Sequence, residues 1–109
     1  MIQWEDFEKI DIRIGTIIHV AKNEKANKPA YILSIDFGAL GILKSSAQIT
    51  KLYDANTLIN KQVAAVVNFP PKQIAQTISS CLVLGTLGEN NEITLLTPDK
   101  LVANGIKVG

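Results

Sequence analysis

Polar side chains suited to hydrogen bonding with another molecule are concentrated in Lys44–Thr50, directly after a short apolar run. Lys44 supplies a cation, Ser45 and Ser46 supply adjacent hydroxyls, and Gln48 supplies an amide. Such groups at the end of a strand bind phosphate, 2′-hydroxyl or peptide groups. The alternative is purely structural, because the same hydroxyls would also cap the turn that follows. Lys51 adds a second cation just after this segment.

A second candidate stretch begins where the most apolar part of the chain ends. Val63–Val67 is a continuous run of small and β-branched residues, which is typical of a strand covered on both faces. The run is followed by Asn68, Phe69, Pro70 and Pro71. Proline has no N–H to donate to a strand ladder, so we expect pairing to stop there. Strand exits on rigid scaffolds commonly carry binding residues.

Residues that catalyse reactions or bind metals are sparse. Cys81 is the only cysteine and His19 the only histidine, and neither has a second metal ligand or a nucleophile at a recognisable spacing. No phosphate-binding glycine loop, zinc spacing or nucleophile elbow occurs. We therefore expect no catalytic residue, metal or cofactor, and rank an enzyme below a binding protein. Cys81 is expected to be a small buried apolar residue, and His19 an exposed strand residue.

The charge is nearly balanced overall but unevenly distributed. The 109 residues carry a net charge of +1, yet residues 19–72 hold seven lysines against three acidic residues, and both ends are net acidic. Such a distribution favours one weakly positive face, although scatter over the surface is the alternative. Three of these lysines lie in the polar loop 21–30, which is either a phosphate-contacting finger or a solvated loop. The solvated loop is the simpler interpretation.

The periodicity of apolar residues predicts a single all-β domain over residues 1–109. Strands are expected at 10–20, 31–38, 42–50, 63–67, 81–85 and 93–97, with short helical turns at 4–9 and 51–60. Gly15 is expected to mark a bulge, Ile59 to face inward, and residues 72–80 to form an irregular crossing anchored by Ile74 and Ile78. The pattern favours a small five-stranded Greek-key OB-fold barrel with N- and C-terminal extensions over a β-sandwich.

Apolar residues at both ends of the chain lack an obvious partner. Trp4 and Phe7 lie on one side of a single helical turn, and Val102 and Ile106 belong to a glycine-turned tail. They either cover one end of the barrel or contact a second subunit. The first residues do not resemble a signal peptide and no apolar run approaches the length of a membrane span, so we expect a cytoplasmic protein that does not insert into membranes.

Several short motifs together resemble the tRNA-binding-domain family. In chain order they are Asp6–Ile17, Lys28–Tyr31, Ile35–Gly38, Ser45–Thr50, Val66–Pro71, Leu82–Gly85 and Pro98–Asp99. The resemblance covers essentially the whole chain. It is closest to the free-standing CsaA-like members, described as export-related chaperones, and more distant from the tRNA-binding appendices of methionyl- and phenylalanyl-tRNA synthetases. It implies an OB barrel and a homodimer formed through the terminal segments.

The resemblance also implies which residues face RNA. By position these are Lys44, Ser46, Gln48, Asn68 and Lys72, to which the residue pattern adds Lys51. The synthetase appendices have basic residues where this chain has Gln73 and Ala75, which argues against tight tRNA binding. We therefore expect weak, salt-dependent binding of tRNA or other structured RNA.

The alternative partner is an unfolded or precursor polypeptide. Phe69, Pro70, Pro71 and Ile74 would leave an apolar groove at the mouth of the barrel. The opposing consideration is that a small barrel needs the same residues to fill its core. The sequence leaves the choice between these two partners open.

Overall fold

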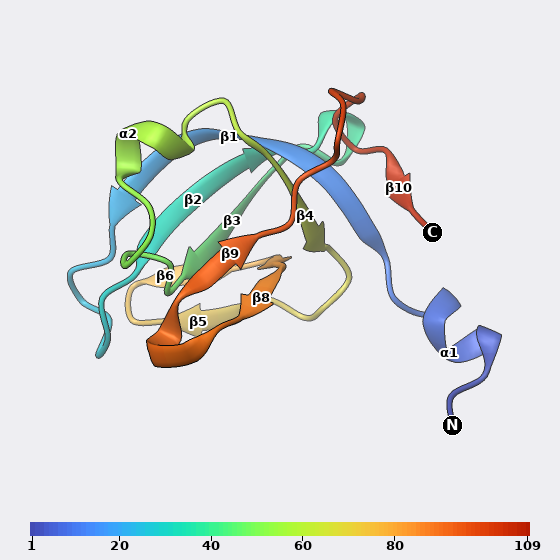
Figure 1. The fold of residues 1–109 in the computed structure, drawn as a ribbon, viewed down its shortest axis with the longest axis horizontal. Coiled ribbons are helices and arrows are strands. Elements are labelled where there is room, and N and C mark those ends of the chain that lie inside the picture. The colour runs from blue at the N-terminus through green and yellow to red at the C-terminus, as the bar shows by residue number, and fades with distance from the viewer.

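A curved antiparallel sheet forms most of the molecule (Figure 1). The computed structural model describes residues 1–109. The sheet has the strand order β3-β2-β1-β4-β7. Its strands are β1 (Ile12–Lys22), β2 (Tyr31–Asp36), β3 (Ile42–Ala47), β4 (Gln62–Val66) and β7 (Leu82–Val83), and β10 (Lys107–Val108) pairs with the start of β1. The expected all-β, OB-like barrel is confirmed.

The long strand β1 holds the barrel together because it pairs with different partners along its length. Its first half pairs with β4, from Ile12 opposite Val66 to Thr16 opposite Gln62. Its second half pairs with β2. Two hairpins complete the β structure: β5 (Lys72–Ile74) with β6 (Thr77–Ser79), and β8 (Gly85–Leu87) with β9 (Ile93–Leu95).

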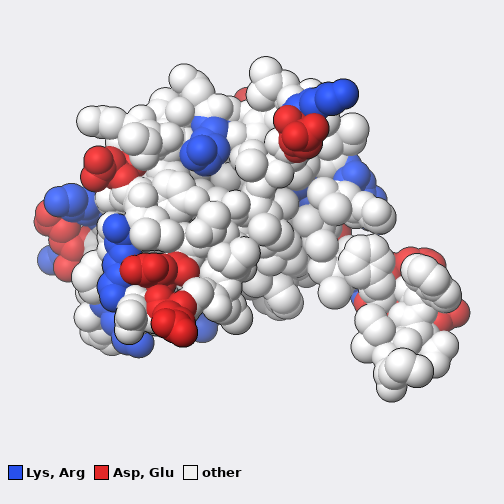
Figure 2. Space-filling view, viewed as in Figure 1, with Lys and Arg blue, Asp and Glu red and all other residues white.

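Helical segments are short and lie at the periphery. They are α1 (Trp4–Glu8), α2 (Ala55–Leu58) and the 3-10 turns Gly38–Leu40 and Glu89–Asn91. No helix has the length and apolar character needed to cross a bilayer. Helix α1 projects from the barrel on the same side as the C-terminus, and Figure 2 shows the N-terminal region as a separate lobe.

The core follows from the alternation seen in the sequence. The largest fully buried side chains are those of Ile17, Leu33, Ile35, Phe37, Leu58 and Val63. Every residue of β4 is buried, as predicted for a strand covered on both faces. Cys81 is buried and His19 is exposed, which confirms both expectations.

Several local predictions are wrong. Residues 72–80 form the regular β5–β6 hairpin, and the side chain of Ile78 is 60% exposed instead of anchoring a crossing. Ile59 is also exposed. The predicted strand at 81–85 is divided into β7 and the start of β8, because the chain changes neighbours at Leu84. The Leu84 N–H donates to Ala64 of β4, while its carbonyl accepts from Leu96.

Gly15 serves close packing and not the predicted bulge. The register of β1 against β2 shifts between Ile17 and His19 instead. At Gly15, a Cβ would lie 2.6 Å from Cγ2 of Ile35 and 2.8 Å from the ring of Phe37. The absence of a side chain therefore lets the fully buried Phe37 ring pack directly on β1.

We expect Gly15→Ala to destabilise the fold by about 1–3 kcal/mol, because the added methyl overpacks a filled part of the core. Chemical denaturation would measure the change. Gly109→Ala is the matched control, since a Cβ there meets no atom within 4 Å. Equal stability of the two variants would show that Phe37 can move aside at no cost.

Candidate functional site

A continuous groove follows the line where β3 meets the segment from β5 to β8. It consists of three clefts of about 690, 490 and 270 Å³ that share lining residues. The first and second clefts share Ser45, Ser46 and Leu82, and the second and third share Gln48 and Asn91. We call this feature the seam groove, and refer to the largest cleft as its wide end and the smallest as its narrow end.

The groove exists because the barrel closes through few bonds along this line. The N–H of Ser80 donates to the carbonyl of Lys44 at 2.8 Å, and the N–H of Ser46 donates to Oγ of Ser79 at 3.2 Å. No strand ladder joins β3 to β6 or β7. The sheet edges therefore diverge on either side of these contacts, and side chains of both edges line the space between them.

Most of the predicted binding residues meet in this one groove. Its lining includes four of the residues predicted to face RNA, Ser46, Gln48, Lys51 and Lys72, and all four predicted to face a polypeptide, Phe69, Pro70, Pro71 and Ile74. Phe69 is 54% exposed, so its ring is not used to fill the core. The RNA and polypeptide hypotheses thus refer to the same surface.

Two predicted RNA contacts lie outside the groove lining. Lys44 is exposed on β3, and its carbonyl is used in closing the barrel. Asn68 holds the exit of β4 against the N-terminal segment: its Oδ1 accepts from the N–H of Asp11 at 3.0 Å, and its Nδ2 donates to the carbonyl of Lys9 at 2.7 Å. These bonds make Asn68 a positioning residue for the neighbouring Phe69.

The residues lining the groove include no carboxylate and three lysines. Lys72 lies at the wide end, and Lys28 and Lys51 lie at the narrow end. Beside the narrow end, Glu89 and Glu92 lie in the same β8–β9 turn as the lining residue Asn91. Figure 2 shows acidic and basic side chains side by side over this turn. At the wide end, Lys72 is the charged residue of the lining.

Hydroxyl groups occupy the middle of the groove. Oγ of Ser46 accepts from Nδ2 of Asn23 at 3.1 Å, which leaves the hydroxyl proton of Ser46 free to be donated. Ser79 and Ser80 instead direct their hydroxyls to the carbonyls of Cys81 and Lys44. Burial raises the pKa of the Cys81 thiol to about 12, so at neutral pH it is protonated and a poor nucleophile.

Sequence reasoning missed several lining residues. Ser79 and Ser80 reach the groove at the end of the β5–β6 hairpin, Leu82 reaches it on β7, and Asn91 reaches it through the β8–β9 turn. Lys28, in the loop predicted to be either solvated or a phosphate-contacting finger, is exposed and lines the narrow end with Gln48 and Lys51. No local pattern marks these residues, because their proximity arises from barrel closure. No group of three or more His, Cys, Asp or Glu side chains suited to a metal ion occurs.

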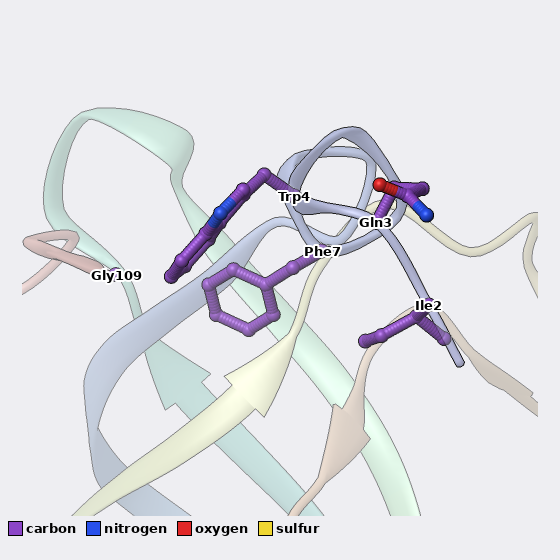
Figure 3. Close-up of a pocket in the computed structure, with 5 residues that line it drawn as sticks. All are labelled: Ile2, Gln3, Trp4, Phe7 and Gly109. Atoms are coloured by element: carbon purple, nitrogen blue, oxygen red, sulfur yellow. The ribbon is translucent and has the colours of Figure 1, made fainter.

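A separate apolar cleft of about 620 Å³ lies between α1 and the C-terminus. Ile2, Gln3, Trp4, Phe7 and Gly109 line it, and the rings of Trp4 and Phe7 project from the same side of α1 (Figure 3). Trp4 is 82% exposed. Of the other predicted interface residues, Ile106 is exposed and Val102 is half-buried.

Polar contacts fix the C-terminal tail on the barrel next to this cleft. The buried Gln62 donates to the carbonyl of Val102 at 2.7 Å and accepts from its N–H at 3.1 Å. Arg13 pairs with Asp11, with 2.6 Å between Nε and Oδ1, and also donates to the carbonyl of Gly105. The hydrogen bond from Arg13 lowers the pKa of the Asp11 carboxyl.

Comparison with known families identifies one matching domain model. The family described as "Putative tRNA binding domain" matches residues 12–107. Among curated proteins, the chain is 36% identical over 107 residues to the methionine–tRNA ligase of Pyrococcus horikoshii and 32% identical over 108 residues to that of Flavobacterium johnsoniae. These matches cover 98% and 99% of the chain, but only 14% and 15% of the ligases.

Solved structures of similar size match over the full chain. The chaperone CsaA of Bacillus anthracis shares 48% identity with a TM-score of 0.96, covering 100% of this chain and 99% of that one. The CsaA chaperone protein of Picrophilus torridus shares 52% identity with a TM-score of 0.94, and both chains are fully covered. A methionyl-tRNA-synthetase-related protein of Pyrococcus horikoshii, 21% identical with a TM-score of 0.88, has the same fold.

We expect Asn68→Ala to release the N-terminal segment from the exit of β4. Loss of the two hydrogen bonds, both near solvent, should lower the free energy of unfolding by about 1 kcal/mol. The amide of Asp11 should also exchange faster with solvent in hydrogen-exchange measurements. Asn27→Ala, which removes an exposed loop asparagine, is the control. Unchanged exchange at Asp11 would contradict the positioning role of Asn68.

Proposed function

The chain belongs to the tRNA-binding-domain family, and from this premise we propose that it binds structured RNA, with tRNA as the first candidate, along the seam groove. Lysines, hydroxyls and amides would contact phosphates and sugars without reading the base sequence. The observation that carries the proposal is the charge of the groove, whose lining includes Lys28, Lys51 and Lys72 and no acidic residue. Catalysis is not part of the proposal.

The expected affinity is modest. The net charge of the chain is only +1, so long-range attraction of a polyanion is weak and binding depends on the groove itself. Gln73 and Ala75 supply no further cations next to Lys72. Each phosphate contact releases counterions, so the affinity should fall steeply with rising salt concentration. The chain spans about one seventh of the ligases it matches, and their aminoacylation activity is not proposed here.

A homodimer would extend the binding surface. The exposed rings of Trp4 and Phe7 beside the C-terminus form an apolar surface that a second copy would cover, with Ile106 and Val102 at its edge. Two copies would present two grooves to one folded RNA, which raises the apparent affinity without new contacts. We also propose a cytoplasmic location, since tRNA and newly made polypeptides are found there.

A second candidate function is binding of unfolded polypeptides. It is favoured by the exposed apolar residues Phe69, Ile78 and Leu82, of which Phe69 and Leu82 line the wide end, and by the description of two similar structures as CsaA chaperones. An extended chain with apolar side chains would occupy the same groove as RNA. Charge distinguishes the two functions, because polypeptide binding of this kind does not need the lysines.

We expect Lys51→Gln combined with Lys72→Gln to weaken tRNA binding and to reduce the slope of log affinity against log salt concentration by about 1.5–2, because two phosphate contacts are lost. Fluorescence titrations at several salt concentrations would measure this. Lys25→Gln, in an exposed loop outside the groove, is the control.

The same double variant separates the two candidate functions. If the variant no longer binds tRNA but still protects a denatured client protein from aggregation, the wild-type protein binds both ligands and only RNA binding depends on the lysines. A tRNA affinity that ignores both salt and these substitutions would rule out the proposed RNA interface.

We expect Trp4→Glu to convert a dimer into a monomer of 11.8 kDa, because a charge would be placed in the apolar interface. Light scattering coupled to size exclusion would measure the mass. Leu87→Glu tests another strongly exposed apolar position, on β8, and should leave the dimer intact. A wild-type protein that is already monomeric at micromolar concentration would contradict the proposed assembly.

A further inference from the structure

Resting on the proposed RNA binding, we infer that the wide end of the seam groove is a site for one unpaired nucleotide, whose base stacks on Phe69 and whose phosphate lies beside Lys72. The proposal therefore names an exposed, single-stranded part of an RNA as the feature that the groove recognises. Its evidence is the juxtaposition of an exposed aromatic ring with a lysine in a cleft whose lining contains no acidic residue.

Phe69 has the environment of a stacking platform. Its ring is 54% exposed and lines a cleft of about 690 Å³, a volume within the range of small-molecule sites. Pro70 and Pro71 fix the backbone after it, and Asn68 fixes the backbone before it. Little conformational freedom is lost when a base covers a ring held in this way, which favours binding.

Positive charge is placed next to this ring. Lys72 is the only charged residue that lines the cleft. Lys72 pairs with Ser79 across the β5–β6 hairpin, and the adjacent Ser80 donates to Lys44. Lys44 on β3 lies beyond Ser80 and outside the lining, so Lys72 is the cation placed next to the ring. No Asp or Glu occurs between Asp54 and Glu89, the segment that supplies most of the lining.

The geometry favours an unpaired nucleotide over a double helix. In an A-form helix the faces of the bases are covered by their neighbours, so a protein ring can stack only on a base that has left the stack. The free hydroxyl proton of Ser46 adds a donor for a phosphate or 2′-hydroxyl in the same cleft. An apolar peptide would use the ring but would leave Lys72 without a counter-charge.

The narrow end differs in each of these properties. Its cleft of about 270 Å³ has no aromatic lining residue, and Nζ of Lys51 already donates to the carbonyl of Asn90. Glu89 and Glu92 lie in the same turn. This end offers polar contacts to a strand but no surface on which a base can stack, so stacking is confined to the wide end.

The test compares a short single-stranded oligoribonucleotide with its duplex at low salt. We expect the single strand to bind about ten-fold more tightly than the duplex, the size of one base–aromatic stack. Phe69→Ala and Phe69→Leu should both remove this difference, whereas Phe69→Trp should retain it. The slope of affinity against salt should be unchanged in all three, because no lysine is altered. Thermal unfolding checks that the variants remain folded.

The outcomes separate this inference from the function on which it rests. Equal binding of single strand and duplex, or unchanged binding by Phe69→Leu, would overturn the stacking site while salt-dependent tRNA binding stands. Loss of binding to a denatured client in Phe69→Ala, with RNA binding intact, would assign the cleft to polypeptides and also overturn it. Absence of binding to any RNA would overturn the proposed function itself.

Discussion

The incomplete closure of the barrel is the constraint on which the binding surface depends. A strand ladder between β3 and β7 would satisfy more backbone groups but would fill the space that the groove occupies. Instead, the N–H of Ser80 donates to Lys44 and the N–H of Ser46 donates to the hydroxyl of Ser79, and these two bonds fix the edges at one point. Because β1 pairs with β4 along its first half and with β2 along its second half, these strands form one continuous sheet, and the barrel keeps its shape although β3 has no ladder to β7.

The placement of charge matters more here than its amount. A net charge of +1 gives little overall attraction for a polyanion. The groove lining, however, contains three lysines and no acidic residue. Local potential in a groove falls off within about a Debye length, so the residues that line it matter more than the total charge. Because the total charge is modest, a ligand with less charge than RNA, such as a polypeptide, can also contact the exposed apolar residues at the wide end.

The sequence predicted those parts of the fold that local patterns encode. Alternation defined β1 and β2, and the uninterrupted apolar run of β4 indicated a strand buried on both faces. The β5–β6 hairpin was missed because its two-residue turn, Ala75–Gln76, lacks the glycine or asparagine that usually marks a hairpin, although Ala75 has the positive φ of 56° that such turns need. The groove was anticipated only as separate pieces, because its continuity depends on contacts between residues far apart in sequence, such as Ser46 with Ser79.

Asn68 illustrates why residue type and position were not enough to assign a role. Its amide was predicted to face RNA, yet both ends of that amide bind the backbone of residues 9 and 11, where the N-terminal segment joins β1. The segment that carries Trp4 and Phe7 and the turn that carries Phe69 are therefore attached to the same side chain, one on each side. If a partner subunit shifts α1, either the hydrogen bonds of Asn68 to residues 9 and 11 must adjust or Phe69 must move as well. If the proposed dimer forms, the position of α1 in the dimer and the orientation of Phe69 at the wide end therefore depend on each other through Asn68. A short amide that bonds to two backbone groups holds such a joint more rigidly than a flexible cation would.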